Sequence, residues 1–290
     1  TPVSAFLLNR SSDLYVRRDG KLREASWDEV FGAIRERLKG LDEKLHCVIT
    51  LTEERAMAQA RRADRELAEG RYRGPLHGIP VAAKDLFYTK ATRTMGGLAV
   101  YREFVPKFDA TVVERLEAAG AILVGKLNLT EGAMAGYHPD FKIPRNPWHK
   151  DLWPGASSSG SGVAVAAGLC YGALGSDTGG SIRFPSMANG IVGLKPTYGR
   201  VSRHGVLPLA PTMDHVGPMT RSVSDAAIMF QAMAGHDTVY HLAANSDIAQ
   251  AAQKPDVDFW DGTYLTHNVL EAMRDHGIAS IVFSSTCATY

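Results

Sequence analysis

Two clusters of serine and glycine, residues 154–162 and 175–181, contain the groups of this chain best suited to catalysis. Serine hydroxyls can act as nucleophiles, and glycines let several backbone N–H groups converge on one point. Together they can build a nucleophile with an oxyanion site. Flexible linkers often share this composition, but an apolar run at 163–169 separates the clusters, and Arg183 and Pro185 follow the second. We therefore interpret the clusters as a site.

Lys84 is the candidate for the base that a serine nucleophile needs. It ends a short apolar run at residues 78–83, bounded by glycine and proline, which is typical of a buried strand. Burial disfavours the ammonium form and lowers the pKa of lysine, so that the neutral amine can accept a proton near neutral pH. The alternative is a surface lysine paired with Asp85.

Other catalytic or cofactor-binding motifs find little support. Residues 120–126 have the spacing of a phosphate-binding loop, but Leu127 occupies its Ser/Thr position. Gly160 and Gly162 lack the third glycine of a dinucleotide fingerprint. The sequence contains no Gly-x-Ser-x-Gly elbow, no His-Glu-x-x-His and no tight His/Cys cluster, which argues against a Ser-His-Asp triad and a catalytic metal. We expect no metal and no cofactor.

The elements that must position these residues alternate between helix and strand, which indicates an α/β fold. A strand ends at Lys84, and a buried helix at residues 162–170 separates the two clusters. Further strands are predicted at 121–124, 238–243 and 278–284, and further helices at 27–41, 52–70, 111–120, 222–233 and 263–275. The clusters form one site only if these elements bury Lys84 against them.

Five motifs in order along the chain resemble the amidase signature family. They are GIPVAAKD at 78–85, PGASSSGSG at 154–162, GSDTGGSIRFP at 175–185, GLKPTYGRVS at 193–202 and DHVGPMTR at 214–221. The resemblance covers residues 46–236. It implies a mixed central sheet covered by helices, incomplete toward its C-terminal side, because family members normally continue beyond this region.

The resemblance also implies a Ser–cis-Ser–Lys triad. Ser181 would be the acylated nucleophile, Ser157 the bridging serine after a cis peptide bond, and Lys84 the base. The backbone N–H groups of Ser181 and the three residues before it would bind the tetrahedral oxyanion: Thr178, Gly179 and Gly180. Asp177 and Arg183 flank the nucleophile and would organise its loop, although a purely structural ion pair is an equally good interpretation.

Two flanks complete the chain. Residues 1–45 form a helical flank whose segment 16–29 resembles a molybdopterin oxidoreductase. Residues 237–290 form an α/β flank resembling an extended short-chain dehydrogenase or epimerase, without that family's dinucleotide glycines. The chain is therefore interpreted as a mosaic around an amidase core at 46–236.

The bulk composition limits the partners. The 290 residues carry 32 Lys and Arg against 31 Asp and Glu, a net charge of +1, so nucleic acid and anionic membranes are not expected partners. Cys47, Cys170 and Cys287 lie far apart and are interpreted as reduced thiols of a cytoplasmic protein. No apolar stretch is long enough to span a membrane. We expect a small-molecule amide substrate and leave a homo-oligomer open.

Three hypotheses on function follow. The first is hydrolysis of a carbon–nitrogen amide bond through an acyl-serine intermediate. The second is the glutamine-hydrolysing subunit of an amidotransferase. The third is an inactive, truncated or chimeric amidase-like protein.

Overall fold

The computed structural model describes residues 15–18, 21–24, 27–134, 136–234, 238–241, 267, 271 and 280–283. The chain divides into two compact units, Thr1–Ala234 and Gly235–Tyr290. In the second unit, β9 (Thr238–His241) and β10 (Ser280–Phe283) pair in parallel, within the two strands predicted there. The helix predicted at 263–275 lies outside the described residues, apart from His267 and Glu271.

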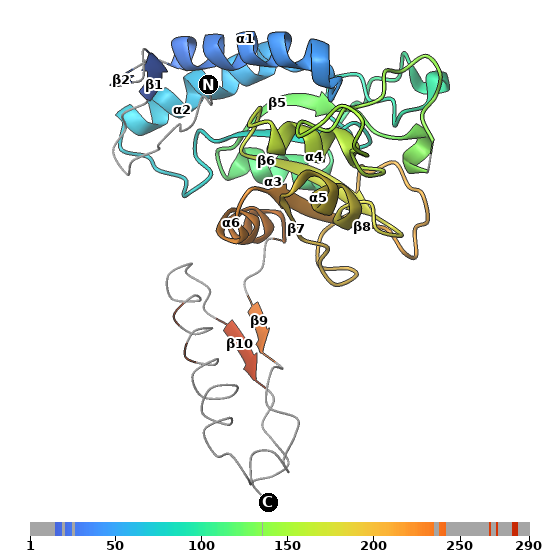
Figure 1. Ribbon diagram of the computed structural model, residues 1–290. Helices are drawn as coiled ribbons and strands as arrows, with labels where there is room; N and C mark the ends of the chain where they lie inside the picture. The colour runs from blue at the N-terminus through green and yellow to red at the C-terminus, as the bar shows by residue number, and fades with distance from the viewer. Residues whose placement is uncertain are drawn as a thin grey trace, which may run out of the picture. The chain divides into compact units, whose positions relative to one another are not determined.

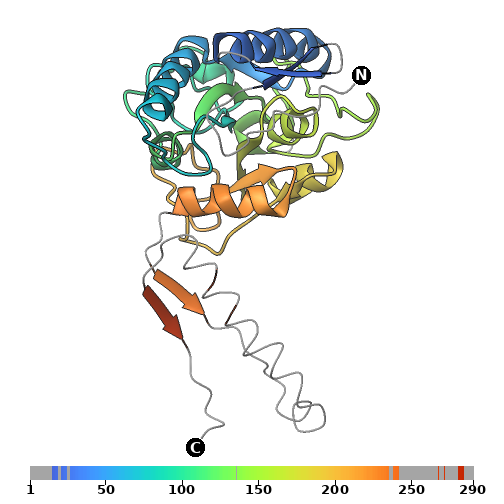
Figure 2. The same ribbon diagram turned by 90° about the vertical axis from the view of Figure 1, so that its left-hand side faces the viewer.

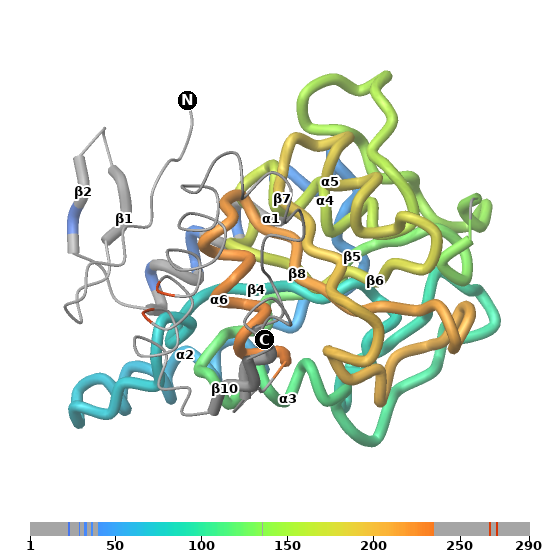
Figure 3. Tube along the Cα trace, turned by 90° about the horizontal axis from the view of Figure 1, so that it is seen from below, coloured from blue at the N-terminus to red at the C-terminus, as the bar shows by residue number. Residues whose placement is uncertain are grey.

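A six-stranded mixed sheet forms the centre of the first unit, in the order β3-β5-β4-β6-β8-β7. The central strand β4 runs parallel to β5 and β6, whereas β3, β8 and β7 run antiparallel to the strands they pair with. Figure 3 shows these strands from below. Their bounds are β3 (Val48–Leu51), β4 (Pro80–Lys84), β5 (Ile122–Leu127), β6 (Gly172–Asp177), β7 (Val192–Gly193) and β8 (His215–Thr220).

Helices cover both faces of this sheet (Figure 1). They are α1 (Trp27–Leu45), α2 (Glu53–Ala68), α3 (Thr111–Ala118), α4 (Ser159–Ala166), α5 (Arg183–Asn189) and α6 (Val223–Ala234). Two short 3₁₀ helices, Ala99–Tyr101 and Glu131–Ala133, and an antiparallel pair, β1 (Tyr15–Arg18) with β2 (Lys21–Glu24), complete the unit.

Two clusters of buried hydrophobic residues lie on opposite faces of the six-stranded sheet. On one face, α2 and α4 pack against the sheet through residues such as Ala60 and Val163. On the other, α3 and α6 pack through residues such as Leu116 and Met233. Figure 2 shows α1, in dark blue, and α6, in orange, on opposite sides of the unit. The predicted α/β class, with a mixed sheet covered by helices, is confirmed.

The elements that carry the two clusters and Lys84 pack tightly. All five residues of β4 are buried, as the apolar run predicts. The helix predicted at 162–170 begins three residues earlier as α4, and its residues 159–165 are all buried. A Cβ on Gly160 would lie 2.5 Å from the carbonyl oxygen of Asn128, so only a residue without a side chain fits there.

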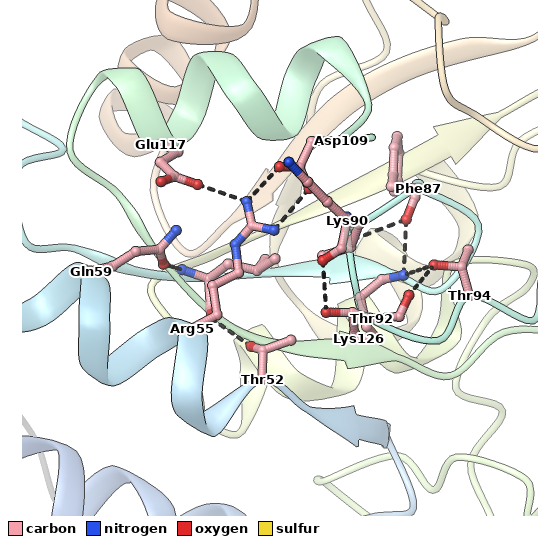
Figure 4. A network of polar contacts seen from close by, with 12 residues as sticks. Thr52, Arg55, Gln59, Phe87, Lys90, Thr92, Thr94, Asp109, Glu117 and Lys126 are labelled. Atoms are coloured by element: carbon pink, nitrogen blue, oxygen red, sulfur yellow. Dashed lines mark hydrogen bonds and ion pairs between the residues drawn. The ribbon is translucent and has the colours of Figure 1, made fainter. Parts of the chain in front are cut away.

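A polar network ties the segment after Lys84 to two helices (Figure 4). Arg55 of α2 donates to Asp109 at 2.8 Å and to Glu117 of α3 at 2.7 Å. Asp109 also accepts the backbone N–H of Lys90 at 2.8 Å. The chain that leaves β4 is therefore fixed against α2 and α3.

Candidate active site

Lys84 lies at the end of β4 with no exposed surface. Its Nζ donates to Ser157 Oγ at 2.7 Å and to Ser176 Oγ at 2.9 Å. Burial lowers the pKa of Lys84 to about 7, although the negative charges of Asp177 and Asp214 oppose that shift. The lysine therefore has a neutral amine available at physiological pH.

The first cluster brings Ser157 to this lysine. The peptide bond between Ala156 and Ser157 is cis, as the resemblance implies. The next residue joins the two clusters: the Ser158 N–H donates to the Ser181 carbonyl at 3.2 Å, and Ser158 Oγ donates to the Ser176 carbonyl at 3.2 Å. The two clusters are therefore held together by the backbone that flanks Ser157.

The second cluster begins as strand β6 and continues as a loop at 178–182 before α5. Ser181 is half-buried in this loop, and its carbonyl accepts the hydrogen bond from Ser158. No hydrogen bond joins the Ser157 and Ser181 hydroxyls in the part of the chain that the structure describes. The structure thus places Ser181 against the residue that follows Ser157 and shows no partner for its hydroxyl among the described residues.

Asp177 fixes the end of this loop next to α5. Its fully buried carboxylate accepts the N–H groups of Gly180 at 2.8 Å and Ile182 at 3.0 Å. It also accepts Nε and Nη2 of Arg183 at 3.0 and 2.9 Å. Burial alone would raise the pKa of Asp177, but the hydrogen bonds from Arg183 and the backbone hold it below its ordinary value. Asp177 is therefore ionised and organises the loop together with Arg183.

The four N–H groups expected to bind the oxyanion differ in their hydrogen bonding. The N–H of Gly180 donates to Asp177 at 2.8 Å. The N–H groups of Thr178, Gly179 and Ser181 have no hydrogen-bond partner among the described residues. These three N–H groups are available to an oxyanion, and the role of all four stays a prediction.

A cavity of about 370 Å³ borders the site. Ser176, which accepts a hydrogen bond from Lys84, and Thr178, which begins the loop at 178–182, both line it. Asp214 and His215 add polar groups, whereas most of the wall is apolar: Leu86, Ala133, Val206, Leu207, Pro208, Leu209, Pro211 and Val216. A small ligand in this cavity would lie next to the nucleophile loop.

Sequence reasoning assigned no role to Ser176 or Asp214. Ser176 stands within the second cluster, and only the pairing of β6 with β4 reveals its contact with Lys84. Asp214 opens the last motif, and its hydrogen bond to the hydroxyl of Thr178 at 2.6 Å spans 36 residues. Neither contact has a local sequence signal.

The described residues contain no group of three or more His, Cys, Asp or Glu arranged to hold a metal ion. None of the described helices is both long and apolar enough to cross a membrane. Cys47 and Cys170 are free and buried, and Cys287 lies outside the described residues.

Comparison with known proteins finds amidases and amidotransferase subunits among the relatives of this chain. The chain is 52% identical over 217 residues to the putative amidase AmiD of Mycobacterium bovis, a match covering 75% of this chain and 46% of that protein. It is 44% identical over 239 residues to a glutamyl-tRNA(Gln) amidotransferase subunit from Moorella thermoacetica, covering 81% of this chain and 49% of that protein. The chain thus spans about half the length of these curated relatives.

Solved structures with a similar fold include an amidase as well. The native peptide amidase from Stenotrophomonas maltophilia superposes with a TM-score of 0.69 and 33% identity, over 89% of this chain and 58% of that chain. The Amidase family model matches residues 29–260 and so extends into both flanks. The resemblances of 1–45 and 237–290 to other families stay predictions. On this match and these identities, the chain belongs to the amidase family.

Proposed function

We propose that this chain hydrolyses a carbon–nitrogen amide bond through an acyl-serine intermediate, with Ser181 as nucleophile, Ser157 as bridge and Lys84 as base. The observation that supports it most is the buried Lys84 amine 2.7 Å from the Ser157 hydroxyl. A lysine with its pKa near 7 can take a proton at the pH where an enzyme works.

The proton moves along one path. Neutral Lys84 accepts the hydroxyl proton of Ser157, which accepts that of Ser181 as the Ser181 oxygen attacks the substrate carbonyl. When the tetrahedral intermediate collapses, the proton returns through Ser157 to the departing nitrogen, and the C–N bond breaks. Water then attacks the acyl-serine along the same path and releases the acid. The Ser157–Ser181 contact would tighten when substrate binds, because catalytic hydrogen bonds are often loose beforehand.

The N–H groups of Thr178, Gly179 and Ser181 would stabilise the oxyanion. Loss of one such donor typically costs about 3 kcal/mol of transition-state stabilisation. Asp177, through Gly180 and Ile182, would keep this loop in shape. The expected substrate is a small-molecule amide that occupies the adjoining 370 Å³ cavity. The free, buried thiols of Cys47 and Cys170 support a cytoplasmic location.

Labelling with a fluorophosphonate tests the nucleophile. We expect stoichiometric labelling of the parent, no labelling of Ser181→Ala, and parental labelling of Ser224→Ala, which removes an exposed helical hydroxyl. Equal rates of labelling and amide hydrolysis in the Ser181→Ala variant and the parent would overturn the proposal. A folded parent that resists the probe would instead support the hypothesis of an inactive amidase-like protein.

A second candidate function is glutamine hydrolysis for an amidotransferase, with ammonia passed to a partner protein. The 44% identity to the amidotransferase relative favours it. Under this hypothesis glutamine is hydrolysed in preference to simple amides, and the rate rises when the partner is added. Faster turnover of simple amides than of glutamine, unchanged by a partner, contradicts it.

A further inference from the structure

A second buried carboxylate, Asp214, lies at the opposite end of the nucleophile loop from the Asp177 contacts. The antiparallel pairing of β6 and β8 ends with Asp177 opposite His215. The next residues along these strands are Thr178 and Asp214. Their side chains meet, with Thr178 Oγ1 donating to Asp214 Oδ1 at 2.6 Å. A side-chain hydrogen bond therefore joins the next pair of residues, Thr178 and Asp214, where the backbone pairing of β6 and β8 stops.

The cavity wall holds the Asp214 carboxylate in place. Its oxygens accept the N–H of Leu209 at 3.0 Å and the N–H of Ala210 at 3.0 and 3.1 Å. Asp214 is only 8% exposed, and it forms no ion pair with any described residue. A buried carboxylate needs such donors, because each one removed leaves part of its charge unsatisfied. The Thr178 hydroxyl is thus bound to a group that is already fixed.

We propose that Asp214 is a positioning residue of the acyl-transfer site: it holds Thr178, and thereby directs the N–H groups of Thr178 and Gly179 at the oxyanion. This inference rests on the function proposed above. Asp177 binds Gly180, Ile182 and Arg183 at the far end of the loop. The two carboxylates hold residues 178–182 from both ends, with the oxyanion donors between them.

The position of Asp214 gives it a further connection to the site. Its loop, residues 209–214, forms part of the wall of the substrate cavity, and Thr178 lines the same cavity. A substrate in the cavity therefore contacts the group that positions the oxyanion donors. The Asp214 charge also acts on Lys84, where together with Asp177 it opposes the effect of burial on the lysine pKa.

The test compares Thr178→Val with Thr178→Ser. Valine has the shape of threonine without the hydroxyl donor, whereas serine keeps the donor. We expect Thr178→Val to lower kcat on a chromogenic amide about 10- to 100-fold, the loss typical of a small misplacement of catalytic groups. We expect KM to stay near the parental value, Tm to fall modestly because Asp214 loses one donor, and Thr178→Ser to retain most of kcat. Parental kcat in Thr178→Val, or equal losses in both variants, overturns the proposal.

Asp214→Asn supplies a second readout that a merely structural role would not move. Removal of a negative charge near Lys84 disfavours its ammonium form, so the acid limb of kcat/KM moves to lower pH. Thr178→Val keeps that charge, and its acid limb stays in place. An unshifted limb in Asp214→Asn counts against the proposal.

Fluorophosphonate labelling separates this inference from the proposed function. If the folded parent is not labelled, the proposed function fails and the inference fails with it. If the parent is labelled and Thr178→Val reacts at the same rate, only the role of Asp214 is overturned.

Discussion

Lys84 and Lys126 lie one register pair apart on the neighbouring strands β4 and β5, both fully buried, and only Lys126 has a carboxylate partner among the described residues. Lys126 Nζ lies 3.0 Å from Asp85 Oδ1. It also donates to the Phe87 carbonyl and the Thr94 hydroxyl, each at 2.8 Å (Figure 4). Lys84 contacts two hydroxyls instead. The same residue type thus contacts a buried carboxylate on one strand and, under the proposed function, serves as a base on the next.

The pH dependence of kcat/KM in the parent protein should report the protonation of Lys84. The amine is active as a base only when neutral, so kcat/KM should rise with pH through an acid limb with its midpoint near 7. A pH profile with a chromogenic amide measures this midpoint. A rate independent of pH between about 6 and 8 would be incompatible with Lys84 as the base.

Replacement of Lys84 should remove activity without destabilising the fold. In Lys84→Met an apolar chain of similar length replaces an amine whose pKa is depressed in the folded state. The parent's penalty is fully present below about pH 7 and fades as pH rises toward the ordinary value of 10.5. We expect the variant to unfold at higher denaturant than the parent at about pH 7, and this advantage to shrink toward about pH 10. A lower midpoint than the parent's at every pH contradicts the assigned burial penalty.

Lys126→Met is the matched control and should behave in the opposite way. It leaves the Asp85 carboxylate buried without its cation, which typically costs about 3–5 kcal/mol. The free energy of unfolding, measured in urea, should fall by this order. The double variant Lys126→Met/Asp85→Asn should recover part of the loss, and no recovery would mean that the charge pair is not the cause.

The small residues of β6 should be sensitive to size. A Cβ on Gly172 would lie 2.2 Å from Met229 Sδ of α6, so Gly172→Ala should destabilise the fold by about 1–3 kcal/mol. Gly179→Ala is the control, because no atom lies within 4 Å of its Cβ position and its φ is not positive. Thermal unfolding of both variants checks the contrast, and equal Tm values would show that α6 yields to the added methyl.

Part of the fold follows from local patterns: β4 is a short apolar run with clear ends, whereas the apolar stretch within α4 predicted the helix but not its bounds. Strand β6 was not predicted, since its Gly-Ala-Leu-Gly-Ser-Asp sequence has little strand propensity. Its small residues are required by neighbours distant in the sequence, such as Met229 at Gly172. Tertiary packing determined this strand.

Part of the candidate site could likewise be predicted from the sequence, and part could not. Lys84, Ser157 and Ser181 came from motifs, and the structure brings the first two into contact. The engagement of the Gly180 N–H could not be foreseen, because it depends on how the loop turns back onto Asp177. Such contacts are set by backbone geometry that residue types alone do not specify.

Under the proposed function, the two hydroxyls around Lys84 would also set the direction in which protons travel. A neutral amine has two hydrogens and a single lone pair, whereas an ammonium group has three hydrogens and none. With one hydrogen given to Ser176, the lone pair can face Ser157 and receive its hydroxyl hydrogen. The oxygen of Ser157 then presents its own lone pairs outward, toward the next hydroxyl. Ser176, which would take no part in bond breaking, would thereby give the proposed relay its polarity.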